Sequence, residues 1–163
     1  MKIYELIAPC HFGLESVLKR EIQDLGYDVT LVEDGKVTFA ADADGIARAN
    51  MFLRTAERVL IKVGKFKAET FDELFENTKA LPWEEFLPQD AKFWVAKAAS
   101  IKSKLFSPSD IQSIMKKAIV ERMKQVYKVS WCPETGAEYP LRVTLMKDEV
   151  TIVAISGIWI ADD

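Results

Sequence analysis

The chain has 163 residues, of which 49% are hydrophobic and 29% are charged, and its net charge is −3. This composition fits one large or two small globular domains, and it excludes a disordered, collagen-like or disulfide-rich chain. No apolar run approaches the roughly 18 residues that a membrane span needs, and the N-terminus does not resemble a secretory signal. We therefore expect a cytoplasmic protein with no membrane contact.

The reactive side chains form no catalytic or metal-binding pattern. Cys10 and Cys132 lie far apart in the sequence, and the single histidine, His11, directly follows Cys10. Neighbouring side chains on an extended segment point in opposite directions, so we interpret His11 as a loop residue beside a small buried cysteine. No zinc-ligand spacing, dinucleotide fingerprint or phosphate-binding glycine loop occurs. The sequence predicts neither a metal site nor a catalytic residue.

The first 64 residues predict the element order β-α-β-β-α-β. Pro9 ends the first apolar strand, Gly26 follows the first helix, and Asp34-Gly35 suits the turn of a hairpin. This order is the ferredoxin-like pattern, for which we expect a four-stranded antiparallel sheet with two helices on one face. The expected strands are 3–8, 29–31, 37–39 and 59–63, and the expected helices are 14–25 and 43–56.

A second unit of mixed α/β type is expected over residues 65–157, after a boundary near Gly64 that has no linker-like composition. Its best helix begins at Ser107-Pro108, where serine suits the N-cap and proline the first helical position, and Asp110 suits the first turn. The other expected elements are a short helix capped by Thr70, a helical turn at 81–88, a strand around 93–95, a loop at 99–106 and a closing hairpin around Lys147-Asp148.

The helix after Ser107 is predicted to be amphipathic. Its apolar residues recur at helical spacing and should face the core, and its polar residues should face solvent. The apolar set is Ile111, Ile114, Met115, Ala118, Ile119, Met123 and Val126, and the polar set is Gln112, Ser113, Lys116, Lys117, Glu121, Lys124 and Lys128.

The small net charge conceals a strong asymmetry. Residues 69–90 carry seven acids and one lysine, a net −6, whereas residues 92–128 carry nine basic and two acidic side chains, a net +7. A basic segment of this density in an acidic protein indicates a surface for a polyanion.

The loop that leads into the long helix gathers the groups that bind phosphate. Lysine ammonium groups, serine hydroxyls and the N–H groups of a helix start all favour an anion. A single aromatic residue there, Phe106, argues against sequence-specific reading of single strands, and we expect Leu105 and Phe106 to pack in the core. The candidate nucleic-acid-binding residues are Lys102, Ser103, Lys104, Ser107, Lys116 and Lys117.

Several separated segments, in order along the chain, resemble a known family. The segments are Pro9–Glu15, Leu53–Val59, Ser100–Ser107, Asp110–Ile114, Lys116–Arg122 and Pro133–Gly136. Together they resemble the ferredoxin-like domain and the THUMP domain of bacterial rRNA guanine-N2 methyltransferases, over about residues 1–157. The resemblance implies an RNA-binding module that presents structured RNA, ribosomal RNA in the family, to an S-adenosylmethionine-dependent catalytic domain.

The chain departs from the family at its end. Residues 158–163, which include Trp159, do not resemble the basic connector to the catalytic domain. The cofactor loop and the Asn-Pro-Pro-Tyr-type motif of that domain do not occur in this sequence. We therefore expect this chain alone to bind no S-adenosylmethionine and to methylate nothing.

Two other functions fit parts of the pattern. An acylphosphatase-type enzyme shares the ferredoxin-like order, but it needs an arginine between the first strand and helix, and none precedes Arg20. A protein-interaction or scaffold module would arise if the basic segment 92–128 met the acidic segment 69–90 of a neighbouring copy. Salt-sensitive self-association without RNA would indicate the scaffold.

Overall fold

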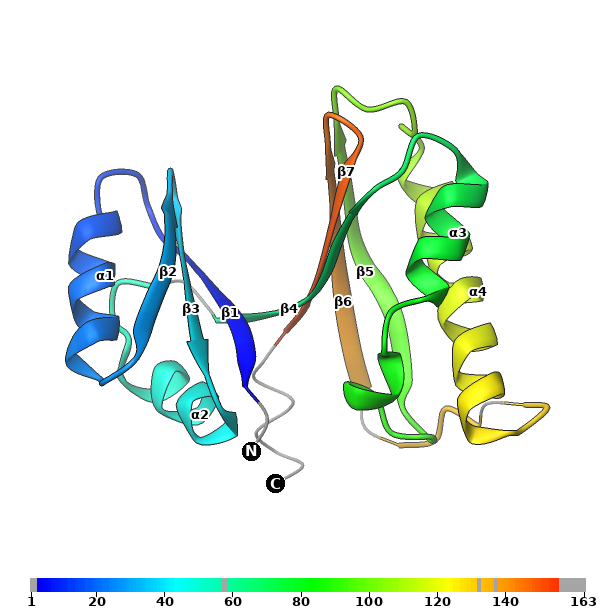
Figure 1. The fold of residues 1–163 in the computed structure, drawn as a ribbon, viewed down its shortest axis with the longest axis horizontal. Helices are drawn as coiled ribbons and strands as arrows, with labels where there is room; N and C mark the ends of the chain where they lie inside the picture. The colour runs from blue at the N-terminus through cyan, green and yellow to red at the C-terminus, as the bar shows by residue number, and fades with distance from the viewer. Residues whose placement is uncertain (1–2, 57–58, 132, 137, 156–163) are drawn as a thin grey trace. The chain divides into compact units, whose positions relative to one another are not determined.

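The computed structural model describes residues 3–56, 59–131, 133–136 and 138–155 (Figure 1). This part of the chain is a mixed α+β structure with four α-helices and seven strands, which confirms the predicted fold class. It divides into two compact units: the described residues up to Lys62, together with Ile155, form the first, and residues 63–154 form the second, so the division falls within strand β4 (Leu60–Lys67). Residues 158–163 and Cys132 lie outside the described residues.

The first unit is a four-stranded antiparallel sheet with the strand order β2-β3-β1-β4. Figure 1 shows α1 and α2 on the same side of this sheet, and the ferredoxin-like prediction is confirmed. The elements of this unit before β4 are β1 (Tyr4–Pro9), α1 (Glu15–Asp24), β2 (Asp28–Glu33), β3 (Lys36–Ala41) and α2 (Ala43–Phe52).

The core of the first unit consists of the buried residues of its strands and of one face of each helix. Strand β1 lies inside the sheet, and its Leu6, Ile7 and Ala8 are all buried. Helix α1 buries Leu18 and Ile22, which are four residues apart and therefore share one face.

The turn before α1 is held by a carboxylate. Glu15 accepts hydrogen bonds from the amides of Gly13 at 2.8 Å and Gly35 at 2.9 Å. Gly35 has a φ of +80°, which the hairpin turn between β2 and β3 requires. The Gly35 amide is the main cause that lowers the pKa of Glu15. The side chain thus fixes two irregular segments to one another.

Helix α2 is shorter than the sequence predicts. The expected helix over 43–56 ends at Phe52, and Leu53 is extended. The Glu21 carboxylate accepts from the Arg54 amide at 2.9 Å, the Thr55 amide at 3.3 Å and the Thr55 hydroxyl. These amides have a partner outside the helix, so the chain turns away from α2. Burial raises the pKa of Glu21, but the hydrogen bonds from Thr55 and Arg54 outweigh it, and the net shift is downward.

We expect Glu21→Gln to destabilise the first unit by about 1 kcal/mol at neutral pH, because the charge that strengthens these hydrogen bonds is lost. A lowered folded-state pKa means that ionised Glu21 stabilises the fold above its unfolded pKa, and that this contribution disappears as pH falls through the folded pKa. Thermal unfolding should therefore show the two proteins converging in acid. Asp24→Asn, an exposed change on the same helix, should leave the unfolding temperature nearly unchanged; a constant gap at every pH would contradict the assignment.

The second unit has the strand order β4-β7-β6-β5, with β5 and β6 parallel and β6 and β7 antiparallel. Helix α4 connects the parallel pair, and Figure 1 shows α3 and α4 side by side on one face of the sheet. The elements after β4 are α3 (Phe71–Lys79), the 3-10 helix η1 (Trp83–Glu85), β5 (Lys92–Ile101), α4 (Pro108–Tyr127), β6 (Glu138–Met146) and β7 (Glu149–Ile155).

Two strands extend further along the chain than the sequence predicts. Strand β4 continues through Gly64, where a Cβ atom would lie 2.7 Å from a methyl group of Leu81. Strand β5 pairs with β6 as far as Ile101 opposite Met146, so residues 99–101 are strand and not loop. The Thr70 cap is confirmed, since its hydroxyl accepts from the Glu73 amide at 3.1 Å.

Most of the apolar residues predicted to face the core from helix α4 are buried. Val126 is 36% exposed instead of buried, since it lies near the end of the helix, and Ile114 is only half-buried. The buried residues are Ile111, Met115, Ala118, Ile119 and Met123.

Candidate functional site

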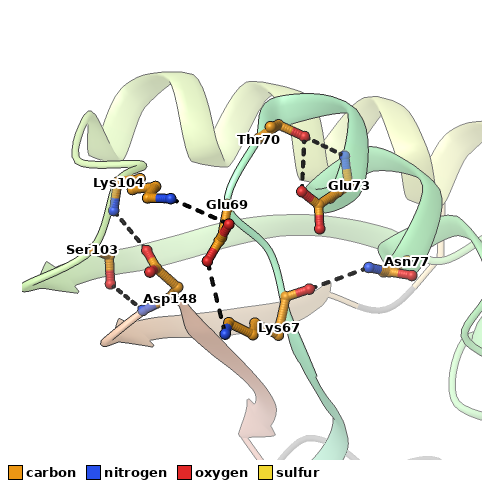
Figure 2. A network of polar contacts seen from close by, with 8 residues as sticks. All are labelled: Lys67, Glu69, Thr70, Glu73, Asn77, Ser103, Lys104 and Asp148. Carbon is orange, nitrogen blue, oxygen red and sulfur yellow. Dashed lines mark hydrogen bonds and ion pairs between the residues drawn. The ribbon is translucent and has the colours of Figure 1, made fainter.

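The candidate site is the loop Lys102–Ser107 between β5 and α4, which we call the basic loop. Lys102 starts it with a φ of +50°, in the left-handed region that non-glycine residues seldom adopt. Figure 2 shows that the loop lies beside the β6–β7 turn and the segment that leads into α3. Both neighbours contribute hydrogen bonds to it.

The β6–β7 turn is tight and unusual in composition. Lys147 and Asp148 have consecutive positive φ angles of 50° and 68°, which is typical of a two-residue hairpin turn usually built with asparagine and glycine. The Lys147 amide donates to the Ile101 carbonyl at 3.0 Å, and the Asp148 carbonyl accepts from the Ala68 amide at 2.9 Å. The turn is therefore bonded to the end of β5 and to the end of β4.

Asp148 fixes the basic loop through its side chain and its backbone. Its carboxylate accepts from the Lys104 amide at 2.7 Å, and its own amide donates to the Ser103 hydroxyl at 3.0 Å (Figure 2). The Ser103 hydroxyl in turn donates to the Ile101 carbonyl at 3.1 Å. The single hydroxyl proton of Ser103 is used inside the protein, so this residue positions the loop.

Lys104 is held loosely by an acidic neighbour. Its ammonium lies 3.2 Å from Oε2 of Glu69, and the Lys67 ammonium lies 3.8 Å from Oε1 of the same carboxylate (Figure 2). The Lys104 side chain is 65% exposed. Exposed ion pairs contribute little to stability and are screened by salt. A phosphate can therefore replace Glu69 at small cost.

Lys102 and Lys117 are exposed and form no ion pair within the described part of the chain. Ser107 is the N-cap residue and Pro108 the first helical residue, as predicted. The expected side-chain cap is wrong, because the Ser107 hydroxyl bonds no amide of the first turn and lies 3.4 Å from the Ser109 hydroxyl. No side-chain cap therefore competes for the amides at the start of α4.

Lys116 has a different environment from the other candidates. Its half-buried ammonium donates to the Phe93 carbonyl, pairs with Glu134 and lies 3.9 Å from the centre of the Phe93 ring. The structure thus brings Lys102, Ser103, Lys104 and Ser107 into one loop. Lys116 is directed at β5, since a long side chain at the edge of the polar face can reach the sheet.

Other members of the basic segment pair with acids of the same chain. Arg122 forms two hydrogen bonds with Glu84, at 2.7 and 3.1 Å, and this pairing is the main cause that raises the pKa of Arg122. Tyr127 donates to the Leu87 carbonyl at 3.0 Å, and burial, helped by the charge of Glu84, raises its pKa. The acidic segment is therefore partly neutralised within its own chain.

Phe106 is exposed, although the sequence predicts that it packs in the core. The expectation that Leu105 is buried is confirmed, with 5% exposure, but Phe106 is 78% exposed. Outside a helix, adjacent side chains point in opposite directions, so only one of the two can face the core. The direct succession of Leu105 and Phe106 in a loop is thus the sequence feature that indicates that one of them is exposed.

Within the described residues, no group of three or more histidine, cysteine, aspartate or glutamate side chains could hold a metal ion. Among the helices of the same described ranges, none is long and apolar enough to cross a membrane.

The chain thus joins a ferredoxin-like unit to a second α+β unit that carries a basic loop before its longest helix. The RlmL ferredoxin-like domain family matches residues 5–60, and the THUMP domain family matches residues 68–154. The chain belongs to the THUMP domain family and carries an RlmL-type ferredoxin-like domain before it.

Related proteins are described as methyltransferases. YpsC of Bacillus subtilis (strain 168), described as an RNA methyltransferase, is 51% identical over 159 residues, which are 96% of this chain and 41% of YpsC. The ribosomal RNA large subunit methyltransferase K/L of Marinomonas sp. (strain MWYL1) is 31% identical over 86 residues, 53% of this chain and 12% of that protein. SMU.472, described as a methyltransferase and solved with SAH, superposes with a TM-score of 0.91 at 40% identity, over 95% of this chain and 42% of its own. The chain thus spans less than half the length of these relatives.

We expect Asp148→Gly to release the basic loop, since glycine tolerates the positive φ of the turn but removes the carboxylate. The Lys104 amide should exchange with solvent at least about tenfold faster, the factor that corresponds to losing one charge-assisted hydrogen bond. Amide hydrogen exchange measures this. Asp148→Asn keeps an acceptor oxygen and a residue that tolerates positive φ, so it should retain most of the protection; equal exchange in the glycine variant and the parent chain would show that the carboxylate does not hold the loop.

Proposed function

We propose that this chain is the RNA-binding module of a methyltransferase, and that the basic loop is the part of its surface that contacts RNA phosphates. The observation that carries the proposal is a lysine-rich loop held in one conformation by Asp148, inside a domain of the THUMP family. The residues proposed to contact RNA are Lys102, Lys104, Ser107 and Lys117, with Ser103 positioning the loop.

The chemistry of these groups suits a phosphate backbone. Lys102 and Lys117 form no ion pair with an acid of the described ranges, and the Lys104 partner is exposed and exchangeable. Amides at the start of α4 add donors that favour an anion. Phosphate contacts of this kind position an RNA without reading its bases, so the affinity should be modest and salt-dependent. Lys116 is not among the proposed contacts, since Phe93 and Glu134 already bind its ammonium.

We infer further that the module presents structured RNA, such as ribosomal RNA, to an S-adenosylmethionine-dependent catalytic domain in the cytoplasm. The support is that methyltransferase relatives extend well beyond the region shared with this chain, and that one of them was solved with SAH. No role in catalysis or cofactor binding is proposed for the residues of this chain.

The scaffold alternative loses part of its basis in the structure. It required the acidic segment 69–90 to pair with the basic segment of a neighbouring copy. Glu69 and Glu84 instead pair with Lys104 and Arg122 of the same chain. The charge that would drive self-association is therefore smaller than the sequence suggests.

We expect the double variant Lys102→Ala, Lys104→Ala to weaken binding to every structured RNA by a similar factor. Each phosphate contact contributes just under one unit to the slope of log affinity against log salt, so this slope should fall by roughly 1–2 units. Fluorescence polarisation across a salt series measures both quantities, and circular dichroism should show an unchanged fold, since these side chains are exposed.

The matched control is Lys79→Ala, Lys124→Ala, which removes the same charge from the last turns of α3 and α4. It should retain nearly the full salt slope. Equal losses in the two double variants would mean that only net charge matters, and the basic loop would not be the RNA site.

Glu69→Gln should strengthen RNA binding, because it removes the carboxylate that competes with phosphate for Lys104. An exposed ion pair of this kind corresponds to at most about a fivefold gain in affinity. The same polarisation assay measures it at low salt, where the gain should be largest. Glu76→Gln makes the same change of charge at an exposed position of α3, and it should produce a smaller gain. A lower affinity after Glu69→Gln would assign Glu69 a role in shaping the loop.

A further inference from the structure

The basic loop carries an aromatic ring, that of Phe106, which does not pack in the core. Phe106 is 78% exposed, although phenylalanine is among the residues most often buried. In the second unit only Trp131, among the described residues, presents a comparably exposed ring, at 70%. Lys102 and Lys104 precede Phe106, so the loop that carries the ring also carries two exposed ammonium groups.

The backbone on both sides of the ring is fixed. On one side, Leu105 is buried, and its carbonyl accepts a hydrogen bond from the Ser100 hydroxyl at 2.5 Å. On the other side, the Ser107 carbonyl accepts from the Ile111 amide at 3.0 Å, as the first bond of α4. The ring is therefore held in solvent by an ordered backbone, and its exposure does not result from a frayed segment.

We propose that Phe106 stacks on one unpaired base of the RNA whose phosphates the lysines of the loop contact. Every nucleobase has a flat face, so stacking on a phenyl ring tolerates any sequence. A paired base inside a helix offers no accessible face, so a stacking residue selects RNA with a bulged, looped or terminal nucleotide. The inference rests on the proposed function, and it adds the class of substrate: structured RNA with an unpaired nucleotide next to a helical stem.

The experiment compares two RNA hairpins on the full chain, one with a single bulged 2-aminopurine in its stem and one fully paired. Phe106→Leu keeps an apolar side chain and removes the aromatic face. It should weaken binding to the bulged hairpin by about tenfold, leave binding to the paired hairpin unchanged, and abolish the change in 2-aminopurine fluorescence on binding. Phe106→Trp should retain both the affinity and the fluorescence change.

The matched control is Trp131→Leu, which removes an equally exposed ring about 30 Å away, at the other end of the 20-residue helix α4. It should bind both hairpins as the unaltered chain does. Equal affinity of Phe106→Leu and the unaltered chain for the bulged hairpin would overturn the proposal, and the ring would then be assigned to contact with a protein surface.

The salt dependence separates this inference from the proposed function. Phenylalanine carries no charge, so Phe106→Leu should leave the salt slope unchanged, whereas loss of Lys102 and Lys104 lowers it. If the lysine variant alone weakens binding, the stacking inference fails and the proposed function stands. If the lysine variant has the full affinity and slope, the proposed function fails together with the inference.

Discussion

The hydrogen bonds of Asp148 are the interaction on which the candidate site depends. Backbone groups in irregular segments need partners, and a loop of six residues between a strand and a helix provides few of its own. Asp148 supplies them from a turn 44 residues further along the chain, through its carboxylate and its amide. The Lys147 amide and the Asp148 carbonyl extend the same contact to β5 and β4. The positions of Ser103 and Lys104 follow from this turn, whereas the Ser100 hydroxyl and the first hydrogen bond of α4 fix the backbone around Phe106.

In the first unit, two other carboxylates likewise accept hydrogen bonds from backbone amides of irregular segments. Glu15 accepts the amides of Gly13 and Gly35, and Glu21 accepts those of Arg54 and Thr55. In each case a half-buried carboxylate holds an irregular segment that regular secondary structure leaves without partners. Hydrogen bonds that involve a charged group are stronger than neutral ones. The chain therefore orders its loops with acids, which accounts for part of its acidic composition.

The basic side chains of residues 92–128 fall into two groups in the structure, one paired with acids and one exposed. Arg122 and Lys116 are half-buried, and each is matched by an acid, Glu84 and Glu134 respectively. These pairs hold α4 to neighbouring segments and leave little field for a ligand. The lysines of the basic loop are exposed, and the Lys104 ammonium forms an exposed ion pair with Glu69. The exposed positive charge that no acid neutralises is therefore smaller, and more local, than a net +7 over residues 92–128 suggests.

The sequence by itself determined the order of elements, the two-unit organisation of α+β type, the start of α4 and the position of the basic loop. These follow from local signals: apolar periodicity, Pro108 after Ser107, and turn residues such as Asp34-Gly35. Only the tertiary structure decided where α2 and β5 end, which lysines are paired, and that Phe106 is exposed. The reason is physical, because each of these depends on a partner distant in sequence: Glu21 for the residues after α2, β6 for the end of β5, and Glu134 for Lys116. Periodicity within a segment carries no information about such partners.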